Sequence, residues 1–310
     1  MLGDVPVRRL GLGAMRLTGP GTWGAPSNRT AAKHVLRRAI ELGVNLIDTA
    51  DAYGPGVSER LIAEALHPYT EELVIATKGG RTRQGPYQWG SDCRPESLRG
   101  ACEASLRRLR LERIDLYQLH TVDPRVPLEE SVGALAELQA EGKVRHIGLC
   151  NVSVDHLSRA RSVASIVSVQ NSYSLADRSS EPMVVVCEHE RLAFLPWMPL
   201  FRGALAGGLS RLGRIAKAHG ATPGQVALAW LLHRSSTMLP IPGTSSAAHL
   251  EENLEARKLR LTTAEVEALD RYRLPEVHAL RRRLRHRMRP VAVPILGSIL
   301  APRSRADEER

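Results

Sequence analysis

The stretch NRTAAKHVLRRAIELGVNLIDTADAYG, residues 28–54, reads as a helix followed by a strand and a polar turn. In residues 28–42 the apolar side chains recur on one helical stripe, and Gly43, a residue type that commonly ends helices, comes directly after. The short apolar run at residues 45–48 then indicates a buried strand. Helices that alternate with strands are typical of a parallel sheet.

The same alternation continues along most of the chain. Helices are predicted at 28–42, 95–109 and 128–141. The eight predicted strands are residues 10–15, 45–48, 73–77, 114–119, 144–150, 166–170, 193–198 and 238–242. Eight strand and helix units within roughly 250 residues predict an α/β fold of the closed (β/α)8 type, the TIM barrel. An open doubly wound sheet is the alternative, but the segment GLGAMR at residues 11–16 lacks the third glycine of the dinucleotide fingerprint.

Composition sets the outer limits. The chain has 310 residues, of which 43% are hydrophobic, enough for one large domain, which we expect at residues 1–275. The four cysteines form no CxxC pair and no cluster with histidine, so no metal site and no disulfide framework is expected. The N-terminus lacks a signal-like apolar region and no run is long enough to span a membrane. A cytoplasmic protein is expected.

The net charge of +10 comes mainly from the C-terminus, because residues 271–310 hold 11 arginines and four acidic residues. We expect residues 276–310 to form a basic tail that is partly disordered or covers the barrel mouth. Its amphipathic pattern would also suit contact with an anionic membrane surface or with RNA, although a solvated tail is the simpler interpretation. No nucleic acid partner is expected.

Four ionisable residues follow predicted strands. Asp48 ends the second strand, Tyr53 lies in the loop behind it, Lys78 ends the third strand and His120 ends the fourth. In a barrel the carboxyl ends of all strands meet at one opening. Each residue alone could be structural, as a helix cap, a turn aromatic, a solvated strand end or a hydrogen-bonded core histidine, but their joint placement favours a common site.

These four side chains suit general acid catalysis on a carbonyl group. A Lys78 ammonium would stabilise the phenolate of Tyr53 and lower the pKa of that phenol, and Asp48 would balance the lysine charge. His120 would donate a hydrogen bond to the substrate oxygen. None of these groups can carry a hydride, so a cofactor must supply it.

Several motifs in order resemble the aldo-keto reductases. They are GLGAMRL, NLIDTADAYG, IATKGG, YQLH, HIGLCNVS, VQNSYS and IPGTSSAAHLEENLEA, and the likeness spans about residues 7–272. The opening and closing motifs look most like a bacterial subgroup that includes pyridoxal reductases. The resemblance implies a catalytic tetrad of Asp48, Tyr53, Lys78 and His120, with Tyr53 as proton donor.

The resemblance also implies a nicotinamide cofactor across the barrel mouth. Its carboxamide would be held by Asn151 and Gln170, and Trp197 would stack on its ring in place of the usual tyrosine. Cys150 stands where a serine is common. The remaining cofactor contacts that the resemblance implies are Met15, Leu200, Arg202, Gly243, Thr244, Ser245, Ser246, His249, Glu252 and Asn253.

NADPH is the expected cofactor. NADH stays possible, because two basic residues usual in NADP-preferring members are replaced here by Gly243 and His249. Hydroxyls and backbone N–H groups at residues 244–246 would bind the phosphate, and helix capping by Ser246 is compatible with that.

The substrate is predicted to be a small aldehyde or ketone. Trp23, Tyr87 and Trp89 follow predicted strand ends and would line an apolar pocket, with the long loop at residues 79–94 over the opening. Arg81, Arg83 and Arg202 could meet a charged substrate, although solvated surface charge is the simpler interpretation. A regulatory or sensor protein that binds the cofactor with little turnover is the alternative function. The oligomeric state is left open.

Overall fold

A parallel sheet forms the centre of the computed structural model, which describes residues 1–201 and 210–271. Seven parallel strands follow the order β1-β2-β3-β6-β7-β8-β9. They are β1 (Leu12–Gly13), β2 (Leu46–Asp48), β3 (Val74–Gly79), β6 (Ile114–Leu119), β7 (Val144–Cys150), β8 (Ile166–Gln170) and β9 (Ala193–Phe194). The TIM barrel expected from the sequence is confirmed.

The eighth predicted strand, residues 238–242, is a correction, because it forms one isolated parallel bridge and no regular strand. It still closes the ring. On one side it hydrogen-bonds with Phe194 of β9, and on the other the carbonyls of Pro240 and Pro242 accept N–H groups from the chain around β1. Both prolines lack the N–H that a regular ladder requires in return, so the hydrogen bonding toward β1 runs in one direction only.

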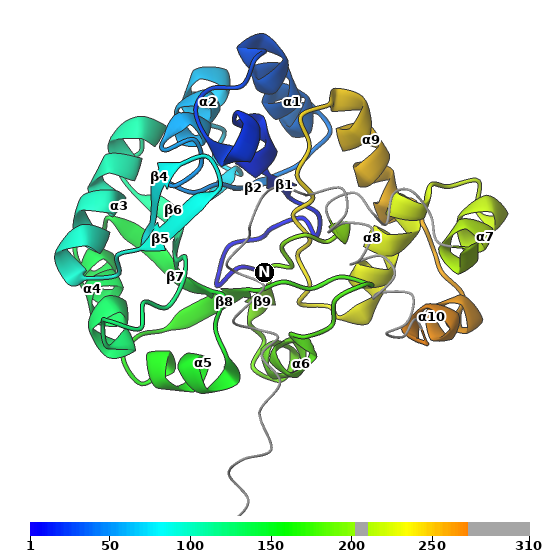
Figure 1. Cartoon of the computed structure of the whole chain (residues 1–310). Helices are drawn as coiled ribbons and strands as arrows, with labels where there is room; N and C mark the ends of the chain where they lie inside the picture. The colour runs from blue at the N-terminus through cyan, green and yellow to red at the C-terminus, as the bar shows by residue number, and fades with distance from the viewer. Residues whose placement is uncertain (202–209, 272–310) are drawn as a thin grey trace, which may run out of the picture. The chain divides into compact units, whose positions relative to one another are not determined.

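Helices surround this sheet on the outside (Figure 1). They are α1 (Arg29–Glu41), α2 (Val57–Leu66), α3 (Pro95–Leu109), α4 (Leu128–Ala140), α5 (Val154–Arg161), α6 (Glu181–His189), α7 (Ser210–Ala218), α8 (Pro223–Arg234), α9 (Ala247–Glu255) and α10 (Thr263–Asp270). Short 3-10 helices lie at Ala14–Leu17, Pro20–Thr22 and Ala256–Lys258. The three predicted helices match α1, α3 and α4 to within one residue at each end. The predicted basic tail, residues 276–310, lies outside the described residues.

The barrel interior is apolar toward the amino ends of the strands. Leu46, Val74, Leu116 and Leu239 form one cluster there with Leu2 of the N-terminal segment, and each is at most 2% exposed. Hydrogen bonds between Leu2 and Val5 fold this segment back on itself, so that its apolar side chains plug the barrel. These apolar side chains close the barrel at the amino ends of the strands.

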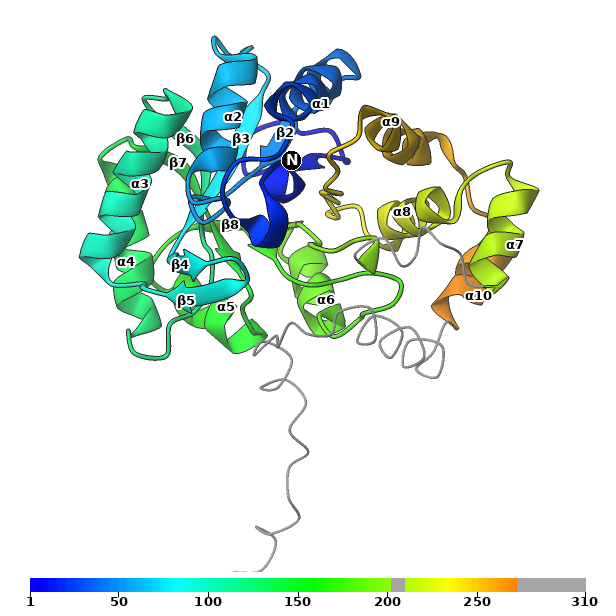
Figure 2. The ribbon, with the colours of Figure 1, turned by 45° about the horizontal axis from the view of Figure 1, so that its top comes forward.

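One insertion lies between β3 and α3. Strands β4 (Arg81–Gly85) and β5 (Gln88–Ser91) pair antiparallel and form a hairpin separate from the main sheet. Figure 2 shows this hairpin standing beside the ends of the barrel strands. The loop predicted at residues 79–94 is thus an ordered β-hairpin.

Candidate active site

The alternation of side chains along the barrel strands positions the four predicted catalytic residues. On β2 the side chain two residues after Leu46 on the same face is Asp48, and on β3 the corresponding inward position at the carboxyl end is Lys78. His120 follows β6 directly, and Tyr53 lies in the turn after β2. All four are nearly buried, with exposed fractions of 2% for Asp48, 0% for Lys78, 8% for His120 and 7% for Tyr53.

Lys78 links two of the other three residues. Its Nζ lies 2.7 Å from Oδ2 of Asp48 and 3.4 Å from the hydroxyl of Tyr53, and it donates to the carbonyl of Thr49 at 2.6 Å. The ion pair between Lys78 and Asp48 is fully enclosed in protein. A buried ammonium requires such a partner, because desolvation of an unpaired charge is costly.

The second oxygen of Asp48 is held by two amides. Oδ1 accepts from Nε2 of Gln170 at 2.7 Å and from Nε2 of Gln118 at 3.2 Å. Gln118 was not predicted as a site residue, although it lies two residues before His120 on the same face of β6 and therefore in the barrel interior. These bonds fix the carboxylate and through it the lysine.

The electrostatics of the phenol differ from the sequence prediction. Burial raises the pKa of Tyr53 to about 12, because its effect outweighs the opposing effect of Lys78. Burial alone would lower the pKa of Lys78, yet the carboxylate of Asp48 keeps that pKa above its ordinary value. The expected net lowering of the Tyr53 pKa is therefore wrong for this structure. Lys78 does act in the expected direction.

His120 is held as a neutral imidazole. Burial, together with the positive charges of Lys78 and Arg81, puts its pKa well below the ordinary range. Its ring meets Tyr53 edge-on with the centroids 5.9 Å apart and meets Trp89 in the same manner at 6.3 Å. Nδ1 of His120 is buried and has no hydrogen-bond partner among the described residues. An unpaired buried nitrogen is expected where a ligand or water completes the site.

Arg83 of the hairpin lies against Trp89, whose ring meets His120, and also near Trp23. The Arg83 guanidinium lies 3.8 Å from the Trp89 ring centre and 5.7 Å from that of Trp23. All five of its N–H groups donate to backbone carbonyls, including that of Ala52 next to Tyr53. Arg83 is therefore neither solvated surface charge nor free to meet a substrate. Tyr87 lies at the hairpin turn and is 52% exposed.

The residues expected to hold a nicotinamide lie next to the tetrad. Asn151, at a positive φ of 58°, donates to the carbonyl of His120 and accepts from the indole N–H of Trp197. Gln170 uses its amide nitrogen on Asp48, and no described residue donates to its Oε1. A carbonyl acceptor, an adjoining amide and a half-exposed indole form a donor and acceptor set that fits a carboxamide-bearing ring.

The residues expected to hold the cofactor phosphate begin α9. Thr244 and Ser246 bond within the turn, and Ser246 caps α9 by accepting from the N–H of His249. A Cβ at Gly243 would lie 2.9 Å from the Gly13 carbonyl oxygen and 3.3 Å from Cγ of Arg16. The aliphatic part of the Arg16 side chain thus lies beside Gly243. The sequence gives no sign of this contact, because residues 16 and 243 are far apart in the chain.

The other predicted cofactor residues are placed less uniformly. Met15 is 39% exposed and Asn253 is buried at 7%. The carboxylate of Glu252 accepts from the hydroxyl of Thr222 and so joins α9 to the cap of α8. Ser245 is exposed and Leu200 is half-buried. Arg202 lies outside the described residues.

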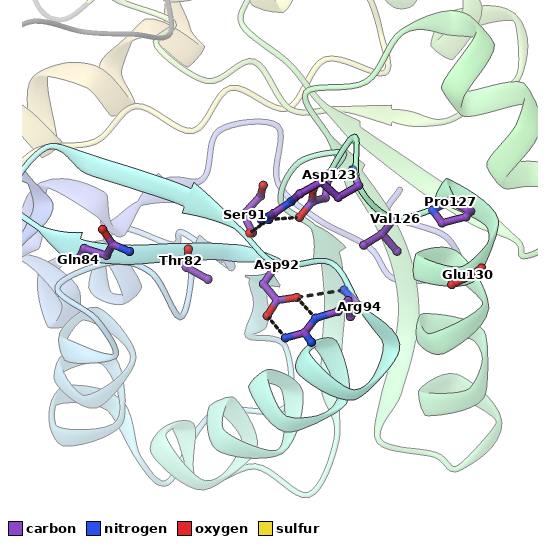
Figure 3. A pocket seen from close by; sticks show the side chains of 10 residues that line it. Thr82, Gln84, Ser91, Asp92, Arg94, Asp123, Val126, Pro127 and Glu130 are labelled. Atoms are coloured by element: carbon purple, nitrogen blue, oxygen red, sulfur yellow. Dashed lines mark hydrogen bonds and ion pairs between the residues drawn. The ribbon is translucent and has the colours of Figure 1, made fainter.

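A polar groove of about 750 Å³ runs outside the hairpin, between β4, β5 and the loop after β6 (Figure 3). Two ion pairs line it, Asp92 with Arg94 and Asp123 with Arg125. Residues of the tetrad do not line this groove, and we place the site at the barrel opening because the buried charges lie there.

Within residues 1–201 and 210–271, no group of three or more His, Cys, Asp or Glu side chains could hold a metal ion. Helices in the same ranges are all too short or too polar to cross a membrane.

Comparison with known proteins gives consistent matches. The model of the Aldo/keto reductase family matches residues 9–273. Pyridoxine 4-dehydrogenase of Escherichia coli is 46% identical over 275 residues, which cover 87% of this chain and 96% of the relative. An uncharacterized oxidoreductase of Schizosaccharomyces pombe is 45% identical over 269 residues, 87% of this chain and 88% of the relative. A crystal structure of an aldo/keto reductase from Klebsiella pneumoniae in complex with NADP and acetate is 29% identical, with a TM-score of 0.73 and coverage of 86% of this chain and 91% of that one.

Proposed function

Because this chain belongs to the aldo/keto reductase family, we propose that it reduces an aldehyde or ketone to an alcohol with NADPH, and that Tyr53 donates the proton. Membership makes it an NAD(P)H-dependent oxidoreductase. The observation that carries the finer proposal is the position of the Lys78 ammonium, between the Asp48 carboxylate and the Tyr53 hydroxyl.

The four residues divide the acid catalysis among them. At neutral pH Tyr53 keeps its proton, because its pKa is about 12. When the carbonyl oxygen gains negative charge, the phenol donates this proton, and the Lys78 ammonium at 3.4 Å stabilises the phenolate that remains. Asp48 holds the lysine in place and keeps it charged. The neutral imidazole of His120 orients the carbonyl oxygen without competing as an acid.

The nicotinamide, when bound, supplies the hydride. Asn151 and Gln170 would hold its carboxamide, and Trp197 would pack on its ring. NADPH rather than NADH is proposed because Arg16 beside Gly243, and the hydroxyls of Thr244, Ser245 and Ser246 at the start of α9, offer a cation and donors for a phosphate. Pyridoxal is the first substrate to examine, since the E. coli relative is named for pyridoxine oxidation.

The test is Tyr53→Phe in the full-length protein, assayed by NADPH oxidation with a panel of aldehydes and ketones that includes pyridoxal. Loss of the proton donor is expected to lower kcat by about 10²- to 10⁴-fold. The affinity for NADPH, measured by fluorescence titration, is expected to change little, and the same titration should give weaker binding of NADH. Tyr69→Phe is the matched control, because among the described residues the Tyr69 hydroxyl bonds only to the carbonyl of Leu109, the last residue of α3.

Two results would contradict the proposal. Turnover by Tyr53→Phe equal to that of the wild type would remove Tyr53 from the reaction. A wild-type protein that binds NADPH and reduces no carbonyl compound in the panel would instead favour a cofactor-binding sensor. Equal affinities for NADH and NADPH would overturn the phosphate contacts alone.

A further inference from the structure

Two arginines project from the same face of strand β4. Arg81 and Arg83 are half-buried. Thr82, which follows Arg81, and Gln84, which follows Arg83, are exposed. Across the hairpin Arg81 pairs with Ser91 and Arg83 pairs with Trp89. Since alternate residues of a strand share a face, Arg81 lies on the side of the hairpin that carries Trp89 toward His120.

The two guanidinium groups have opposite environments. Arg83 is saturated, because its five N–H groups donate to five backbone carbonyls. Arg81 forms no hydrogen bond and no ion pair with any residue in the described ranges. Burial lowers the pKa of Arg81, so its charge is held partly out of water without compensation. A desolvated and unpaired cation is costly to a fold unless a ligand completes it.

The charge of Arg81 acts on the catalytic opening. It contributes to the lowered pKa of His120 and also acts on the thiol of Cys150 at the end of β7. Two other cations near the tetrad have bonded partners, since Lys78 is paired with Asp48 and Arg83 donates to backbone carbonyls. Of Lys78, Arg81 and Arg83, only Arg81 lacks a bonded partner among the described residues.

Neighbouring acids do not neutralise this charge. Asp92 and Asp123, whose charges act on the same thiol of Cys93 as Arg81 does, are each bound by another arginine. Asp92 pairs with Arg94 and Asp123 pairs with Arg125, each at 2.8 Å, and the first pair is drawn in Figure 3. Both carboxylates lie in the groove outside the hairpin. Both acids thus have an arginine partner close in sequence, and neither forms an ion pair with Arg81.

We propose that Arg81 binds an anionic group of the substrate, a carboxylate or a phosphate, while the carbonyl group lies at Tyr53 and His120. The proposal rests on the carbonyl reductase function and adds a substrate class to it. A guanidinium presents a planar fork of donors that matches both anions. Trp89, on the same face, would pack on the part of the substrate between its anion and its carbonyl.

The test compares anionic and neutral aldehydes of similar shape with full-length wild type, Arg81→Gln and Arg81→Lys. The carboxylate pair is 4-carboxybenzaldehyde and its methyl ester, and the phosphate pair is pyridoxal 5′-phosphate and pyridoxal. For the preferred anion, Arg81→Gln is expected to lower kcat/KM by about 10- to 100-fold, the effect of losing a charged hydrogen bond. The neutral partner should lose less than about threefold, so that the anion preference collapses. Arg81→Lys should fall between the two, because it keeps the charge and loses the fork.

The outcomes separate this proposal from the function on which it rests. Reduction of the neutral aldehydes by the wild type tests the reductase function alone. Equal losses on anionic and neutral aldehydes, or no loss in either pair, would overturn the role of Arg81 while the reductase function stands. If no aldehyde is reduced, binding of 4-(hydroxymethyl)benzoate to the protein with NADPH still tests Arg81. An affinity that Arg81→Gln leaves unchanged would then overturn it.

Discussion

The two ends of the barrel interior are equally buried and chemically opposite. Toward the amino ends of β2 and β3 the inward side chains are Leu46 and Val74, exposed by 0% and 2%. Toward the carboxyl ends of the same strands they are Asp48 and Lys78, exposed by 2% and 0%. Only a few residues along a strand separate a hydrocarbon layer from a layer of charges.

This difference separates stability from function within one core. Each large side chain of the apolar layer contributes about 1.5–3 kcal/mol through burial. A buried ion pair contributes little net stability, since its desolvation offsets its attraction, yet removing one partner is severe. The apolar end should therefore respond to mutation by losing stability alone, and the polar end by losing activity, with stability lost only when a charge is left unpaired.

Asp48→Asn should break the polar end most strongly. The substitution keeps the shape of the side chain and leaves the Lys78 ammonium buried without its counter-charge. We expect a loss of about 3–5 kcal/mol in the free energy of unfolding, measured with urea. The rate of carbonyl reduction should fall by about 10²- to 10⁴-fold in the same preparation, because the lysine no longer supports the phenolate.

The double variant Asp48→Leu/Lys78→Met sharpens this test. Replacement of a buried pair by apolar side chains of similar volume is often neutral or stabilising. Because the amides of Gln118 and Gln170 lose their acceptor, stability should stay about 1–3 kcal/mol below the wild type yet exceed that of Asp48→Asn, while activity stays absent. If the double variant is no more stable than Asp48→Asn, the unpaired charge is not the cause of the instability.

Leu46→Ala should affect the apolar end with the opposite signature. Leu46 is fully buried in the cluster with Leu2 and Leu116, so its truncation leaves a cavity that costs about 2–5 kcal/mol. The activity of the folded fraction should stay near that of the wild type. Leu46→Met is the control, since a similar volume should cost less than about 1.5 kcal/mol. Loss of activity in the folded Leu46→Ala protein would contradict the separation of the two ends.

The sequence predicted the fold well where strands are long and apolar. The predicted strands at 114–119, 144–150 and 166–170 are identical in extent to β6, β7 and β8. Where the chain turns sharply it predicted too much strand, and the expected strands at 10–15 and 193–198 shrink to the two-residue β1 and β9. For residues 238–242 the apolar pattern gave the right place, and the missing proline N–H groups prevented a regular ladder.

The candidate site shows a similar boundary. That Asp48, Tyr53, Lys78 and His120 would lie close together followed from strand ends alone, although their roles remain predictions. The pKa of Tyr53 could not be predicted, because it depends on how completely the loops bury the phenol. The sequence RTR also could not distinguish Arg81 from Arg83, since the carbonyls that saturate Arg83 include those of Gly21, Thr22 and Ala52, from loops far along the chain.

The smallest expected effect concerns Asp51, an acid at the polar end that differs from Asp48 in its surroundings. Its Oδ1 is buried without a hydrogen-bond partner in the described part of the chain. Burial, and after it the charge of Glu59, raises the pKa of Asp51 to about 8. In the unfolded chain an aspartate ionises near pH ~4, so between about pH 4 and 8 the folded state binds the extra proton. The stability that this proton provides is complete at low pH and is lost as the pH rises through 8.

Asp51→Asn removes this titration. Between pH 6 and 7 the wild type should lose up to about 1.4 kcal/mol more unfolding free energy than Asp51→Asn does, measured with urea at each pH. Asp155→Asn is the control, because the Asp155 side chain is 76% exposed and should not alter the slope. Equal slopes for the wild type and Asp51→Asn would mean that Asp51 is ionised in the folded state. The polar end would then hold an ionised carboxylate without a bonded cation. Buried charges there would not need to be paired as Asp48 and Lys78 are.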